Sequence, residues 1–286
     1  MTIAEEGRAS FEDVARRVHT WVERHRNTVD LQFADRLPLP PETHEGAGYL
    51  LMVAAINQQV RAEVVRDVMR DVHATLGEDV FNLHALPADA LTLVWQWWQA
   101  DAQARRWPLL EGNRADRVLR DVARFLEVTR RQGGLNAWAA RHGHVQSCAN
   151  DIARHVPAFG GAASARKKLW MYLRWMVRPT PDLGVWRHVH PRDLRIPLDV
   201  NTMVVFRRLA TAHCVRERLR AEGLRFSGQE RPNAQDVETA TAMARWWYPD
   251  DPACVDYPFF LRGRELFAAE RAVQEPRHPA RRRTEG

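Results

Sequence analysis

Residues 165–177 read ARKKLWMYLRWMV, and this stretch decides the fold class. Its large apolar side chains recur at spacings of three and four residues, the period of an amphipathic helix. Pro179 follows closely, and the residue before a proline disfavours helical backbone. We therefore predict a helix over 165–177, with a core-facing stripe of Leu169, Tyr172, Leu173, Met176 and Val177.

The same period recurs through most of the chain. A helix is expected over 11–25, with Ser10 as its N-cap, and a buried apolar helix over 49–56. No segment of useful length shows the alternation of polar and apolar residues that is typical of a strand. The sequence thus predicts an all-α fold, with further helices at 87–103, 113–130 and 200–210.

Composition places the chain among ordinary globular proteins. Of its 286 residues, 45% are hydrophobic and 27% are charged. No apolar run approaches the roughly 20 residues that cross a bilayer, and residues 1–11 lack the apolar segment of a secretory signal. We expect a cytoplasmic protein with one helical domain over 1–272 and a basic, disordered tail over 273–286 that includes Arg281–Arg283.

Neither a metal nor a cofactor is expected. The three cysteines lie far apart and form no C-x-x-C pair, so a disulfide framework or a metal cluster is not indicated. Two His-x-His pairs lack an obvious third ligand and are interpreted as surface histidines. These residues are Cys148, Cys214, Cys254, His142, His144, His188 and His190.

The basic residues have an unusual composition. The net charge is +6, which fits an anionic partner such as nucleic acid. Only two of the 42 basic residues are lysines, and these are the adjacent Lys167 and Lys168. A lysine can lose its proton and act as a nucleophile, whereas an arginine stays protonated. Composition alone leaves two readings equally open: a reactive amine, or two lysines on a solvated helix face.

Three segments carry a family resemblance: Ser164 to Leu169, the run Leu173-Arg174-Trp175-Met176-Val177-Arg178, and Ile196 to Thr202. Together they resemble bacterial members of the helix–hairpin–helix DNA glycosylase superfamily. They are similar, more distantly, to the archaeal 8-oxoguanine DNA glycosylases. The close resemblance covers about residues 164–208, with weaker likeness at 55–59, 113–125 and 257–265.

The resemblance implies a fold and a catalytic pair. The fold is two helical lobes around a DNA-binding cleft, with a helix–hairpin–helix element and the catalytic helices at about 155–210. The pair is Lys167 as amine nucleophile and Asp199 as its carboxylate partner, which also directly precedes the predicted helix over 200–210 and is placed to cap it. A helix position beside Trp170 would desolvate the Lys167 amine.

Further residues are predicted to contact DNA or the extruded base. One base-binding candidate is Gln58, by resemblance, although an ordinary surface glutamine explains it equally well. The others are tryptophans, each of which is better explained individually as a core residue than as part of a pocket. The hairpin over 159–165 departs from the Leu-Pro-Gly-x-Gly pattern of the superfamily. The predicted base-binding residues are Gln58, Trp95, Trp98 and Trp170, and the predicted DNA-binding residues are Gly160, Gly161, Ser164, Arg166, Lys168 and Arg174.

The resemblance therefore implies a base-excision repair enzyme. It would flip a damaged base, foremost 8-oxoguanine, out of duplex DNA and excise it through a lysine Schiff base, working as a monomer without a membrane partner. The alternative is a non-catalytic nucleic-acid-binding protein of the same fold. The sequence leaves open which lesion is excised and whether strand cleavage follows.

Overall fold

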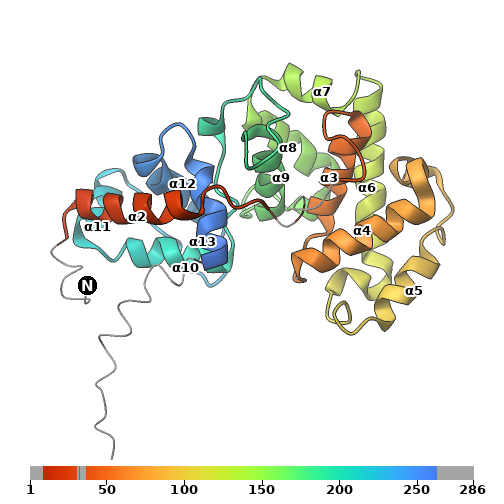
Figure 1. The fold of residues 1–286 in the computed structure, drawn as a ribbon, viewed down its shortest axis with the longest axis horizontal. Helices are drawn as coiled ribbons and strands as arrows, with labels where there is room; N and C mark the ends of the chain where they lie inside the picture. Colours follow the sequence, from red (N-terminus) through yellow and green to blue (C-terminus); the bar gives the residue numbers. More distant parts are fainter. Residues whose placement is uncertain (1–8, 31, 33–36, 263–286) are drawn as a thin grey trace, which may run out of the picture.

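The computed structural model describes residues 9–30, 32 and 37–262, and the predicted tail over 273–286 lies outside them. Within these residues the regular structure is helical, which confirms the all-α prediction, apart from a single bridge between Ser164 and Asn233. Figure 1 shows the helices in two groups. They are α2 (Phe11–His25), α3 (His44–Ile56), α4 (Ala62–Leu76), α5 (Thr92–Ala100), α6 (Arg114–Arg130), α7 (Leu135–His142), α8 (Val145–His155), α9 (Lys167–Val177), α10 (Val200–Leu209), α11 (His213–Ala221), α12 (Ala234–Trp247) and α13 (Asp256–Arg262).

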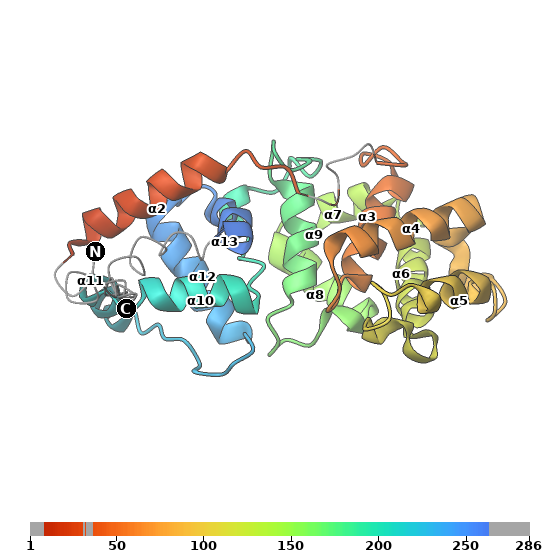
Figure 2. The ribbon, with the colours of Figure 1, turned by 60° about the horizontal axis from the view of Figure 1, so that its bottom comes forward.

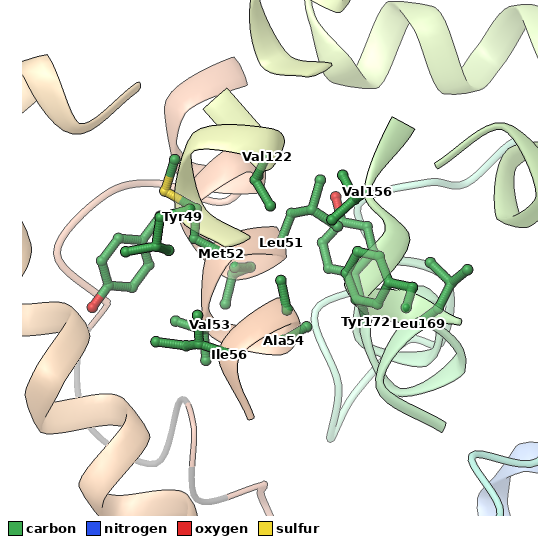
Figure 3. Packing of buried hydrophobic residues seen from close by; sticks show 14 of the residues in the cluster. Tyr49, Leu51, Met52, Val53, Ala54, Ile56, Val122, Val156, Leu169 and Tyr172 are labelled. Carbon is green, nitrogen blue, oxygen red and sulfur yellow. The ribbon is translucent and has the colours of Figure 1, made fainter. Parts of the chain in front are cut away.

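The first lobe is built around α3. Every residue from Gly46 to Ile56 is buried, so this helix is surrounded by others instead of having one solvent face. Figure 3 shows α3 side chains such as Leu51 packed between Val122 of α6 and Tyr172 of α9. A Cβ at Gly48 would lie 2.7 Å from a Leu126 methyl group, so the glycine permits the close approach of α3 to α6. The first lobe comprises α3 to α9.

The second lobe joins the two ends of the described chain. Its hydrophobic core combines α2 residues such as Val18 with residues of α10 to α13 such as Phe206 and Met243. Ser10 caps α2 as predicted, in a reciprocal arrangement with Asp13. Figure 2 shows α2 lying across α12 and α13, so the chain begins in this lobe, passes through the first lobe and returns.

Buried ion pairs connect the two lobes beside α9. Arg174 contacts Asp256 of α13 and Asp30, which follows α2, at 2.5 Å each. One turn further along α9, Arg178 binds Asp251 of the second lobe at 2.8 Å and also Asp182. Removing one partner of such a pair leaves an uncompensated buried charge, so the network holds the lobes in one arrangement.

Some helix boundaries differ from those predicted. The predicted helix over 87–103 is shortened to α5, because residues 87–91 form turns and Asp101 accepts backbone N–H bonds from Gln103 and Ala104 at 2.7 and 3.2 Å. Such a local Asx-type turn competes with the helix. Within the described residues no helix is both long and apolar enough to span a membrane.

Candidate active site

Lys167 and Asp199 meet where the two lobes face each other. Lys167 is the first residue of α9, and Asp199 directly precedes α10. The Lys167 Nζ donates to Asp199 Oδ2 at 3.2 Å, although 32 residues separate the pair in sequence. The Lys167 side chain is 38% exposed and that of Asp199 is 14% exposed. The pair is therefore held in place by the fold and still open to a ligand from one side.

The carboxylate of Asp199 has two contacts that fix its position. Its Oδ1 accepts the backbone N–H of Thr202 at 2.8 Å, which makes it the predicted N-cap of α10. Its Oδ2 then faces Lys167. A carboxylate at a helix N-terminus is stabilised as the anion by the helix dipole, so Asp199 is suited to pair with an ammonium or another developing cation.

An open cavity of about 960 Å³ lies between the lobes; Lys167 lines it, whereas Asp199 is not among its lining residues and meets it through its contact with Lys167. The first lobe contributes residues 57–61 and Phe159, and the second lobe contributes Tyr257 and Phe260 of α13. Lys167 Nζ lies 5.2 Å from the centroid of the Phe260 ring. The aromatic neighbour of Lys167 is thus Phe260 and not Trp170, and with over a third of its side chain exposed the amine is less desolvated than the sequence indicated.

Lys168 also lines the cavity, in a different environment. Its Nζ donates to the backbone oxygen of Ala55 at 2.8 Å, near the C-terminus of α3, and to Gln58 Oε1 at 3.5 Å. Phe159 lies beneath it, with 6.0 Å from Nζ to the ring centroid. Burial lowers the pKa of Lys168 to about 8. Gln58, the predicted base-binding residue, therefore shares this wall of the cavity with Lys168.

The loop that joins α8 to α9 is fixed by its own hydrogen bonds. Gly160 has a φ of +90°, and a Cβ there would lie 2.4 Å from Ser164 Oγ, so only glycine fits. Ser164 Oγ donates to the Gly161 oxygen at 2.8 Å. Arg166 folds back, with its Nε at 3.2 and 3.1 Å from the oxygens of Gly160 and Gly161 and its Nη1 at 2.7 Å from Asn150 Oδ1. These hydrogen bonds fix the backbone of the loop that leads into α9.

Arg174, one of the predicted DNA-binding residues, is buried in an ion-pair cluster. Its side chain is only 2% exposed and pairs with Asp30, Asp182 and Asp256. Arg174 lies on the same face of α9 as Lys167, as the seven-residue spacing implies, but two turns deeper in the molecule. Burial raises the pKa of Asp256 to about 6, and its charge interacts with Lys167 and Asp199. Arg174 therefore lies at the buried end of the cavity, where it holds the carboxylates of Asp30 and Asp256 in place.

The three tryptophans predicted to bind the base do not line the cavity. Trp95, Trp98 and Trp170 are 2%, 5% and 3% exposed and belong to the core of the first lobe. Trp98 donates its indole N–H to Asp71 at 3.1 Å, and Trp170 lies 5.8 Å from the Arg195 guanidinium. These three rings are core residues, which is the interpretation that the sequence favours for each of them individually.

The aromatic residues that do line the cavity were not singled out from the sequence. Phe159, Tyr257 and Phe260 surround it from both lobes. Phe159 was noted only as part of the hairpin, and Tyr257 only as the start of a weak resemblance. Phe260 is 39% exposed, which is unusual for so large an apolar side chain. The position of Phe260 beside Lys167 follows from the packing of α13 and cannot be predicted from the local sequence.

The comparison with known families bears on this part of the chain. A family described as "Protein of unknown function (DUF2400)" matches residues 123–265, half of the sequence. The chain belongs to this family. The DUF2400 match includes Lys167, Asp199 and the aromatic residues of α13, whereas Gln58 lies before it. Among curated proteins no match was found.

Proposed function

We propose that this DUF2400 protein is a DNA glycosylase with an associated lyase activity, which excises a damaged base through Lys167. The observation that carries the proposal is the contact of 3.2 Å between the Asp199 carboxylate and the amine of Lys167, which lines an open cavity. The cavity is large enough for an extruded nucleotide, and its aromatic lining offers surfaces on which a base can stack.

The two side chains have complementary roles in this chemistry. Asp199 accepts the proton that Lys167 must lose before its nitrogen can attack C1′ of the nucleotide. As the C1′–N bond forms, the bond from C1′ to the base breaks and its electron pair leaves with the base. The sugar ring then opens: the C1′–O4′ bond breaks as the nitrogen forms a C=N bond to C1′, and O4′ takes the proton that Asp199 holds. The Schiff base formed in this way permits strand cleavage by β-elimination.

The N-terminus of α9 offers an approach for the phosphate backbone. No side chain caps this helix, and Arg166 holds its N-cap position with a left-handed φ of +48°. The first amides of α9 therefore remain available to an anion, a role that helix N-termini fill in phosphate binding. In this proposal the loop with Gly160 and Gly161 takes the role of the phosphate-binding hairpin of the superfamily that the sequence resembles, and double-stranded DNA is the partner.

Borohydride trapping tests the proposal directly. The protein is incubated with a duplex containing 8-oxoguanine, and a covalent protein–DNA adduct is expected on reduction. Lys167→Gln should give no adduct and no base release. Arg131→Gln is the matched control, because it removes a positive charge from a side chain that directly follows α6 and is 77% exposed, and it should behave as wild type.

Two results would count against the proposal in different ways. An adduct that persists in Lys167→Gln would move the nucleophile to another amine. Salt-sensitive binding of lesion DNA without base release or adduct formation, across a panel of oxidised, deaminated and alkylated bases, would favour the non-catalytic nucleic-acid-binding alternative.

A further inference from the structure

The cavity holds both lysines of the chain, and their surroundings differ. Lys167 is paired with a carboxylate. Lys168 Nζ instead contacts two neutral oxygens, those of Ala55 and Gln58, and among the described residues no carboxylate forms an ion pair with it. A buried ammonium without a counter-charge gives up its proton more readily than an exposed one, and the pKa of Lys168 is lowered accordingly, to about 8.

The two amines also belong to different walls of the cavity. Lys167 lies with Asp199 and Phe260, on the side of the second lobe. Lys168 reaches across to the C-terminus of α3 and lies over Phe159, on the side of the first lobe. A nucleotide whose C1′ faces Lys167 would extend its base towards the first-lobe wall. In that arrangement the base edge would lie in the part of the cavity that Lys168 and Gln58 line.

We propose that Lys168 is a second catalytic residue, which donates a proton to the base as it leaves. This inference rests on the proposed function. The electron balance requires such a donor: Lys167 Nζ forms a bond to C1′, the bond from C1′ to the base breaks, and the base departs with the electron pair. A proton from Lys168 Nζ neutralises the departing base, and the neutral amine remains bound to the Ala55 oxygen. Asp199 separately receives the proton from Lys167.

A preformed abasic site separates this role from that of Lys167. Such a site has no base to release, so its Schiff base and strand cleavage need only Lys167. We expect Lys168→Gln to release the damaged base about 10²–10⁴-fold more slowly than wild type under single-turnover conditions. At protein concentrations that saturate the DNA, so that loss of the DNA contact predicted for Lys168 does not limit the rate, the same variant should cleave and be trapped on abasic DNA at close to the wild-type rate, which also shows that it is folded.

Lys168→Arg provides the matched control for charge. Arginine keeps the cation and can still donate to Ala55, but it does not release its proton at neutral pH, so base release should remain slow. Base release at the wild-type rate in either variant would overturn the proposal, and so would an equal loss of both activities in Lys168→Gln. A wild-type protein that cleaves abasic DNA but releases no base from any lesion would refute the glycosylase function itself, whereas a defect of Lys168→Gln confined to base release supports both.

Discussion

Replacing Arg174 by methionine tests whether this residue is a structural ion-pair centre. The methionine retains most of the volume of the side chain but none of its charge. Arg174 is 2% exposed and makes contacts of 2.5 Å with both Asp30 and Asp256. The substitution therefore leaves two buried carboxylates without their main partner, while Asp182 retains Arg178.

The expected loss in the free energy of unfolding is about 3–5 kcal/mol, the range for breaking a buried ion pair on one side. Two charge-assisted hydrogen bonds, at about 1.5–3 kcal/mol each, give a similar sum. The loss should be smaller in acid, below the pKa of Asp256, which burial raises to about 6, because a protonated carboxyl needs no counter-charge.

Urea denaturation followed by tryptophan fluorescence measures this loss. Arg131→Met serves as the control, since its side chain is 77% exposed, and a change within about 0.5 kcal/mol is expected there. A loss below about 1 kcal/mol for Arg174→Met, combined with weaker DNA binding by the folded protein, would refute the structural role. It would restore the DNA contact that the sequence indicated.

Three further outcomes are expected. Asp199→Asn should slow base release about 10²–10⁴-fold through loss of the proton acceptor, while thermal unfolding moves only slightly because asparagine also caps a helix; an unchanged rate would remove Asp199 from the mechanism. Gly160→Ala should destabilise the protein by about 1–3 kcal/mol, since its φ is +90°, and unchanged thermal stability would contradict the loop geometry. The pKa of the Asp256 carboxyl is raised from 3.8 to about 6, so the folded protein binds this proton more tightly than the unfolded chain. The free energy of unfolding of wild type, relative to that of Asp256→Asn, should therefore fall as the pH rises from about 4 to about 6 and then level off. A difference between the two proteins that does not change with pH in urea denaturation would exclude this titration.

Local signals in the sequence predicted local structure well. Ser10 and Asp199 were both expected to cap helices, and both do, because a cap depends on side chains within three residues of the helix start. The proximity of Lys167 to Asp199 came from family resemblance, and the contact between them agrees with it. Helix periodicity alone could not have brought together two residues on separate helices.

Tertiary contacts account for what was missed. Arg174 lies seven residues after Lys167 on the same face of α9, but its partners Asp30 and Asp256 come from distant segments of the other lobe, which the sequence spacing does not predict. A tryptophan in a core and one in a binding site look the same in sequence, and so Trp95 was assigned to the cavity while Phe260 was overlooked. Whether an aromatic side chain such as that of Trp95 or Phe260 lines the cavity depends on which helices face the space between the lobes.

The path of the chain has a consequence for how the protein acquires its structure during synthesis. The core of the first lobe comes almost entirely from one continuous segment, residues 47–194. The second lobe needs α2 together with helices that emerge from the ribosome about 180 residues later. During synthesis the apolar face of α2 therefore stays unpaired while the first lobe folds. The contact between the lobes that contains Lys167 and Asp199 forms last.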